Sequence, residues 1–215
     1  MMPPEALDRL RAEASRADYA SMARLARALY EDGLGPREVL RECYGTAFPE
    51  ELFVVVDAGP WELDLLASFT NQPWQLALPL DRGGPDATPD TLAGTEQRIL
   101  ARDPDLMPLM VIPGTAAGQE DLIVCYRLSE LRVGRPTAFC LRRATGSGEA
   151  VRCGESMLAV LYDEHAESLR LLKEEFRQPS NRGAGSVDGS QVEEAGESLE
   201  LVRELQRLAA SRQGD

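Results

Sequence analysis

The chain has one histidine, His165, so any mechanism that uses a histidine as general base depends on this residue. Serine and cysteine nucleophiles are activated by a neighbouring base, most often a histidine. His165 follows Tyr162-Asp163-Glu164 in a segment with helical spacing, and acidic neighbours are typical of a solvated helix face. A zinc ion needs further soft ligands at helical spacing, and none accompany His165. We therefore predict neither a catalytic nor a metal-binding role for it.

The four cysteines are too widely spaced for a CxxC redox motif or a zinc knuckle. They are Cys43, Cys125, Cys140 and Cys153. Cys125 and Cys140 lie among apolar residues, which favours reduced thiols packed as small hydrophobic side chains. Disulfides belong mainly to exported proteins, and the N-terminal residues lack the basic start and apolar stretch of a signal peptide. We therefore predict buried, reduced cysteines.

Other signatures of catalysis or cofactor binding are missing from the sequence. There is no GxSxG nucleophile elbow, no P-loop and no GxGxxG dinucleotide fingerprint. The aspartates of residues 81–90 lack the alternating oxygen ligands and the glutamate that a calcium loop requires. We therefore predict no cofactor and no metal. An enzyme with Asp- or Glu-based chemistry remains an alternative, which a carboxylate of strongly raised pKa in a cleft would support.

Charge is distributed unevenly along the sequence. The chain carries 36 acidic and 23 basic residues, a formal net charge of −13. Residues 46–130 contain fourteen acids and four bases, a balance of −10. Carboxylates repel phosphates, so we expect no binding to nucleic acid. A negative patch that steers a basic protein partner is a use for such segregation.

The two tryptophans, Trp61 and Trp74, each follow a proline and are candidates for core anchors or for interface hot spots. We expect core packing for at least one of them. The residues predicted to bind a partner are aspartates of the acidic segment together with one tryptophan. They are Asp81, Asp86, Asp90, Trp74, Asp103 and Asp105.

The spacing of apolar residues predicts the elements that must position these side chains. Helical patterns cover residues 5–32, 36–44, 91–102, 155–176 and 192–208, and another helix starts near residue 48. Strand patterns cover residues 107–112, 121–126 and 137–142, with a strand-like piece at 75–80. Residues 53–56 are compatible with either structure. The order predicts an α+β fold: N-terminal helices, a small mostly antiparallel sheet, and C-terminal helices.

A shift in composition divides the chain near its C-terminal end. We predict a single α+β domain over residues 1–177, in which residues 1–40 form a helical extension. Residues 178–191 are rich in Gly and Ser and predict a flexible linker before an amphipathic helix at 192–212. A lone helix of this length is marginal in water, so we expect it to dock on its own domain. No apolar run approaches the roughly 20 residues of a membrane span, and we predict a cytoplasmic protein.

Four segments together resemble the SUKH superfamily, which includes yeast cell-wall-synthesis regulators and bacterial toxin-immunity proteins. Residues 43–53, CYGTAFPEELF, resemble its opening with an aromatic residue, a proline, acids and a second aromatic. Residues 103–109 (DPDLMPL), 122–128 (LIVCYRL) and 136–141 (PTAFCL), followed by a helix from Ser156, resemble its core of three strands and a helix. The similarity covers about residues 44–175, and the chain exceeds the pattern at both ends.

The resemblance implies a non-enzymatic α+β binding module. Bacterial members of the superfamily neutralise a cognate toxin, often a nuclease, by binding it. Nucleases present basic surfaces to phosphates, so an acidic patch agrees with such a role. The alternative is a scaffold or secretion adaptor that binds a partner through its helices, with the C-terminal helix as the contact. The sequence leaves the oligomeric state open.

Overall fold

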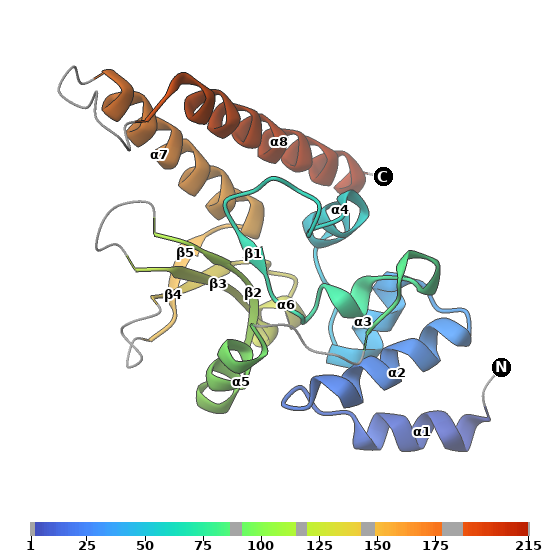
Figure 1. Ribbon diagram of the computed structural model, residues 1–215. Helices are drawn as coiled ribbons and strands as arrows, with labels where there is room; N and C mark the ends of the chain where they lie inside the picture. The colour runs from blue at the N-terminus through green and yellow to red at the C-terminus, as the bar shows by residue number, and fades with distance from the viewer. Residues whose placement is uncertain (1–2, 87–91, 115–119, 143–148, 178–186, 215) are drawn as a thin grey trace.

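The computed structural model describes residues 3–86, 92–114, 120–142, 149–177 and 187–214 (Figure 1). The first part of the chain is helical, as predicted. Its helices are α1 (Pro4–Glu13), α2 (Tyr19–Glu31), α3 (Pro36–Tyr44) and α4 (Glu50–Ala58). The ambiguous residues 53–56 belong to α4 and are buried. α3 and α4 both end at a glycine in the left-handed region, Gly45 (φ 65°) and Gly59 (φ 81°), where other residues are strained.

A five-stranded antiparallel sheet occupies the middle of the molecule, which confirms the α+β prediction. Its strands lie in chain order: β1 (Ser68–Phe69), β2 (Leu106–Ile112), β3 (Leu122–Arg127), β4 (Ala138–Arg142) and β5 (Val151–Gly154). In the ladder Tyr126 lies opposite Met107 on one side and Ala138 on the other. The register of β2 shifts at Pro108, a position that suits a residue without an N–H group. Residues 75–80, expected as strand-like, instead contain the short 3-10 helix η1 (Gln75–Ala77), and a second one, η2 (Leu80–Arg82), begins at residue 80.

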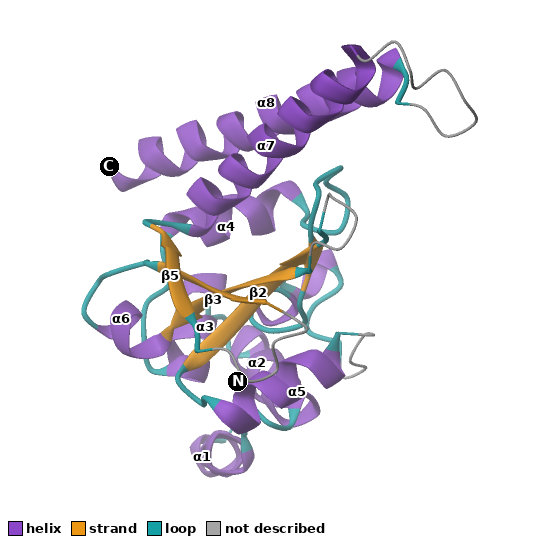
Figure 2. Ribbon diagram, turned by 90° about the vertical axis from the view of Figure 1, so that its left-hand side faces the viewer, coloured by secondary structure: helices purple, strands orange, loops and turns teal. Residues whose placement is uncertain are grey.

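Helices cover both faces of the sheet, which is why every residue of β2 is buried (Figure 2). α5 (Ala93–Arg102) covers one face, and Ile99 packs there against Leu106, Ile123 and Cys125. The opposite face is covered by α4 and by α7 (Met157–Arg177). The short helix α6 (Leu128–Arg132) connects β3 to β4. No helix in the described part of the chain is long and apolar enough to cross a membrane.

The C-terminal helix docks on its own domain, as predicted. α8 (Gly189–Gln213) runs beside α7 and across α4 (Figure 1). Its buried side chains are Leu199, Val202, Leu205 and Ala209. Arg212 Nη1 adds a 2.7 Å contact with Asp57 Oδ2 at the end of α4. Residues 189–191, predicted as linker, are helical because Asp188 caps the helix: its side chain accepts from the Gln191 N–H at 3.1 Å. Residues 178–186 lie outside the described part.

The prediction that the cysteines are reduced was wrong for Cys140 and Cys153. Cys140 on β4 and Cys153 on β5 form a disulfide, with their Cα atoms 5.7 Å apart. The antiparallel pairing of β4 with β5 brings these two residues together, and local sequence context does not report such a pairing. Cys43 and Cys125 are free, and burial raises the pKa of each thiol to about 12.

Candidate partner-binding surface

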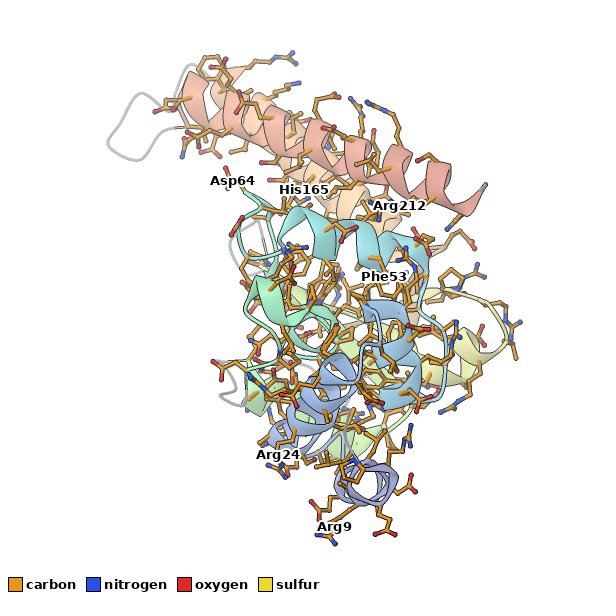
Figure 3. All side chains as sticks on the ribbon, turned by 90° about the vertical axis from the view of Figure 1, so that its right-hand side faces the viewer. Arg9, Arg24, Phe53, Asp64, His165 and Arg212 are labelled. Atoms are coloured by element: carbon orange, nitrogen blue, oxygen red, sulfur yellow. A yellow bond between two sulfur atoms is a disulfide. The ribbon has the colours of Figure 1, made fainter. Side chains whose placement is uncertain are left out.

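His165 is not on a solvated helix face, and that prediction was wrong. Its side chain is 3% exposed and lies under the loop of residues 59–67 (Figure 3). Nε2 accepts a hydrogen bond from the Leu66 N–H at 2.9 Å, so the ring proton is on Nδ1, which donates to Leu161 O at 2.8 Å. Burial lowers the pKa of His165, although the bond to Leu161 opposes this shift. The neutral imidazole therefore holds the 59–67 loop on α7.

The sequence contained a signal for this burial. His165 lies four residues after Leu161 and four before Leu169, both of which are buried on α7. It therefore continues the apolar stripe of the helix, and the acidic neighbours occupy other faces.

Trp74 was predicted to bind a partner, and this prediction was wrong. Its side chain is fully buried, so a partner has no access to it. The indole Nε1–H donates to Leu109 O at 2.6 Å, and the ring packs edge-to-face on Phe69 with centroids 4.9 Å apart. Trp74 is therefore a core anchor that ties the segment before η1 to β2.

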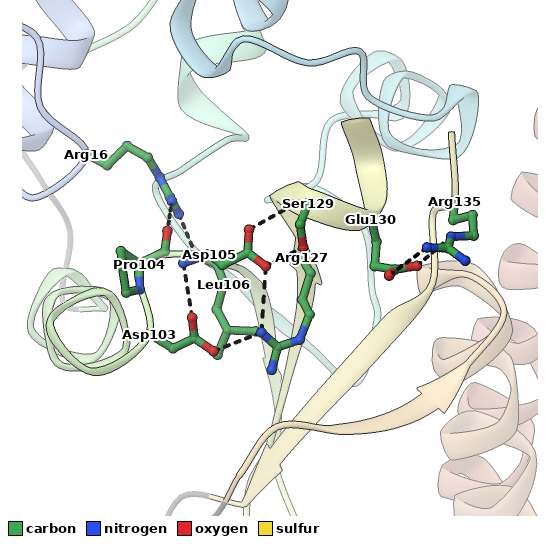
Figure 4. A network of polar contacts seen from close by, with 9 residues as sticks. All are labelled: Arg16, Asp103, Pro104, Asp105, Leu106, Arg127, Ser129, Glu130 and Arg135. Carbon is green, nitrogen blue, oxygen red and sulfur yellow. Dashed lines mark hydrogen bonds and ion pairs between the residues drawn. The ribbon is translucent and has the colours of Figure 1, made fainter. Parts of the chain in front are cut away.

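Asp103 and Asp105 take part in an intramolecular network at the start of β2 (Figure 4). Arg127 Nη1 lies 2.9 Å from Asp103 Oδ2 and 3.7 Å from Asp105 Oδ2. Asp105 also accepts hydrogen bonds from the Ser129 N–H at 2.8 Å and the Ser129 hydroxyl at 2.5 Å. Both carboxylates are half-buried and hold α6 and β3 to the turn that precedes β2.

The surroundings of Asp105 and of Arg16 shift the pKa of each group. Burial opposes ionisation of Asp105, but the hydrogen bonds from Ser129 and the nearby Arg127 outweigh it and hold its pKa below the ordinary value. Arg16 lies next to them, and its guanidinium donates to Pro104 O and to Leu106 O (Figure 4). Burial lowers the pKa of Arg16. These contacts join the N-terminal helices to the sheet, so the acids here have a structural task.

Two further acids of the 46–130 segment point into the protein. Glu51 accepts hydrogen bonds from the Tyr126 hydroxyl and from the N–H groups of Met157 at 3.0 Å and Leu158 at 3.1 Å. It therefore neutralises the positive end of α7. Glu96 on α5 accepts from the N–H groups of Asn71 and Gln72. Neither carboxylate contributes to an acidic surface.

The exposed acids of the segment gather in two loops that border the C-terminal turn of α4. Residues 59–67 follow α4 directly and carry Glu62 and Asp64, and residues 79–86 carry Asp81 and Asp86. Glu62, Asp64 and Asp81 form no ion pair within the described residues. Asp90, also predicted to bind a partner, lies outside the described residues. We call these two loops the α4-end surface.

Both loops are fixed to the body. Arg82 Nη2 donates to Val56 O at 3.0 Å and Nη1 lies 3.8 Å from Asp57 Oδ1, so the 79–86 loop is attached to α4. Arg27 of α2 holds its other end by donating to Pro85 O at 3.1 Å. The 59–67 loop is held by the bond from Leu66 to His165. A fixed surface loses little conformational entropy when a partner binds.

Two hollows of the described structure are lined by charged side chains. A cavity of about 150 Å³ between the start of α2 and α5 is lined by Arg16, Tyr19, Gln72 and Glu96. It is smaller than the roughly 300 Å³ of typical ligand pockets. A wider hollow of about 410 Å³ lies beside β4, and its arginines are paired with Glu130 and Glu155. Within the described residues, no three His, Cys, Asp or Glu side chains are grouped to hold a metal ion.

Comparison with known proteins gave no match to a protein-family model, to a curated protein or to a solved structure.

Proposed function

We propose that this chain is a non-enzymatic protein that binds and neutralises a basic partner protein, as the resemblance to toxin-immunity proteins implies. The observation that carries the proposal is the α4-end surface, where the exposed acids Glu62, Asp64 and Asp81 have no intramolecular ion pair within the described residues. A nuclease-type toxin domain that binds phosphates presents a complementary basic surface.

The fate of the other acids supports this location. Glu50 pairs with Arg37, and Asp103 pairs with Arg127. Glu51 and Glu96 are buried among hydrogen-bond donors. Within the 46–130 segment, the exposed acids Glu62, Asp64 and Asp81 form no ion pair among the described residues, and all three lie in the two loops beside α4.

The two alternatives receive less support from the structure. An adaptor that grips a partner through the apolar side of α8 needs that side free, whereas Val202 and Leu205 are buried against α4 and α7. An acid-based enzyme would be supported by a carboxylate of raised pKa in a cleft. Burial raises the pKa of Glu164, but this residue lies on α7 outside the hollows described above.

The proposal keeps the cytoplasmic location expected from the sequence, and this has a consequence for the disulfide. Glutathione and thioredoxin keep cytosolic thiols reduced, so Cys140 and Cys153 would be thiols in that compartment. Both residues lie on β4 and β5, and neither belongs to the α4-end surface. Partner binding is therefore expected to survive reduction.

The first test is whether a gene beside this one encodes a toxin domain. The second test uses that domain, inactivated at its catalytic residue. Isothermal titration at about 50 and 300 mM salt measures its affinity for the full chain. We expect tight binding that weakens by tenfold or more at the higher salt, because screening shortens the reach of the surface charges. Co-expression with the active toxin should restore growth of the host. Absence of a toxin gene nearby, absence of binding, or affinity that does not change with salt would contradict the proposal.

A further inference from the structure

The α4-end surface also presents two large apolar side chains to solvent. Trp61 is 45% exposed and Leu80 is 39% exposed. Trp61 was considered in the sequence as a hot spot or a core anchor, and the structure assigns the core position to Trp74 instead. Exposure of a large aromatic side chain to water is unfavourable in free energy. Burial of that side chain against a partner would therefore stabilise the complex.

The loops that carry the two side chains are both attached to the last turn of α4. Trp61 lies two residues after Gly59, the residue that ends α4, and a 2.8 Å bond from the Glu62 N–H to Gly59 O closes the turn around it. Leu80 is the first residue of η2, two residues before Arg82, whose guanidinium donates to Val56 O in the last turn of α4. Figure 1 shows the two loops on either side of α4, both on the side toward the viewer.

Leu80 is positioned by backbone geometry as well. Gly83 and Gly84 have φ angles of 100° and 63°, and the Gly84 N–H donates to Pro79 O at 3.0 Å. A Cβ atom at Gly84 would lie 3.1 Å from Leu80 Cδ2, so the glycine leaves room for the leucine side chain. Leu80 and its acidic neighbour Asp81 are thus displayed on a closed turn.

We propose that Trp61 and Leu80 are the anchor residues with which the α4-end surface binds its partner. The partner presents an apolar pocket rimmed by arginine or lysine side chains. The indole fills the pocket and lies against a partner cation, a contact that the electron-rich face of a tryptophan ring favours. Glu62, Asp64 and Asp81 pair with the basic rim. This assignment rests on the proposed function, and it names the residues that supply most of the affinity. The charges add to the affinity by raising the rate of encounter, which is the contribution that salt screens.

The test compares variants of the full chain in titrations against the same inactivated toxin domain. Trp61→Ala is expected to weaken the affinity by about 30-fold or more, the range of interface hot spots. Leu80→Ser is expected to weaken it about 5- to 10-fold. Val133→Ser and Val151→Ser are the matched controls, since these side chains are 62% and 65% exposed elsewhere on the surface. They should change the affinity less than twofold. Circular dichroism and thermal unfolding verify that each variant folds.

The outcomes separate this inference from the proposed function. If the wild-type chain does not bind the toxin domain, the proposed function fails. If it binds, and folded Trp61→Ala and Leu80→Ser variants bind as well as the valine controls, the anchor assignment is wrong while the function stands. If size-exclusion chromatography shows a wild-type dimer that Trp61→Ala dissociates, the occupant of the surface is a second copy of this chain, and the basic partner is ruled out for it.

Discussion

Glu51 shows that a count of acidic residues along the sequence does not tell which of them lie on the surface. It belongs to the acidic segment, yet its carboxylate accepts hydrogen bonds from the backbone at the start of α7. The sequence does not distinguish it from Glu50, since both are acids in the first turn of α4. Only the fold distinguishes them, because Glu50 faces Arg37 near the surface and Glu51 faces α7.

We predict that Glu51→Gln lowers the free energy of unfolding by about 2–3 kcal/mol, because an amide NH₂ would then face backbone N–H donors in a buried site. Glu50→Gln is the control and should cost at most about 1 kcal/mol, as expected for a partly exposed ion pair. Urea denaturation of both variants measures the difference. Equal losses in the two variants would contradict the role of Glu51.

His165 is expected to make stability depend on pH. Burial holds its folded-state pKa below the reference value of 6.5, so the unfolded chain takes up a proton first as the pH falls. The stabilising contribution of His165 is therefore complete above pH 6.5 and declines as the pH falls from there toward the lowered folded-state pKa. His165→Ala removes this effect and leaves the Leu66 N–H without an acceptor.

The measurement compares urea unfolding of wild type and His165→Ala at several pH values. The variant should be less stable by about 1–3 kcal/mol at pH 8, and the difference should narrow between pH 6.5 and 5. Carboxylates titrate in both proteins, so the difference isolates the histidine. A difference that stays constant over this range would show that the pKa of His165 is not lowered by folding.

At the scale of elements, long periodic segments were predictable and edge elements were not. The helical spacing of residues 155–176 and 192–208 identified α7 and α8 because one face of each is buried over many turns. β1 has two residues and β5 is an exposed edge strand, so neither shows an alternating pattern. The segment at η1 is apolar because Leu76 and Ala77 are buried, which the sequence pattern does not distinguish from a strand.

The disulfide is the element-scale feature that the sequence did not predict, and it joins the edge strand β5 to β4. We predict that the double variant Cys140→Ser/Cys153→Ser is less stable than the oxidised wild type by about 2–4 kcal/mol, since the cross-link limits the unfolded chain. Dithiothreitol should lower the melting temperature of wild type toward that of the double variant. It should not change the melting temperature of the double variant.

Thiol titration in denaturant provides an independent check. In protein purified under air without reductant, two thiols, from Cys43 and Cys125, should react before reduction and four after it. A Cys43→Ala variant is the control and should keep the response to dithiothreitol. Four reactive thiols in the untreated protein would show that the disulfide does not form.

At the scale of the whole molecule, the net charge of a sequence segment did not predict which part of the surface is negatively charged. Residues 46–130 carry a balance of −10, but the fold brings bases from distant parts of the chain to their acids: Arg37 to Glu50, and Arg212 to Asp57. The exposed acids Glu62, Asp64 and Asp81 form no ion pair among the described residues, and they lie in the loops beside α4. Sequence analysis therefore predicted the acidic character and two aspartates of the candidate surface, Asp81 and Asp86. It did not select Trp61, because nothing in a Pro-Trp pair reports which tryptophan is buried.

The position of α8 has a consequence for the synthesis of the protein. α4 is complete by residue 58, but part of its cover consists of Val202, Leu205 and Ala209, and Arg212 bonds to Asp57 across 155 positions of sequence. During translation, the apolar surface of α4 and α7 therefore stays exposed to solvent until residues 202–212 of α8 have left the ribosome. Chains that stop before about residue 199 would expose this surface permanently, and such products are natural substrates for chaperones and proteases.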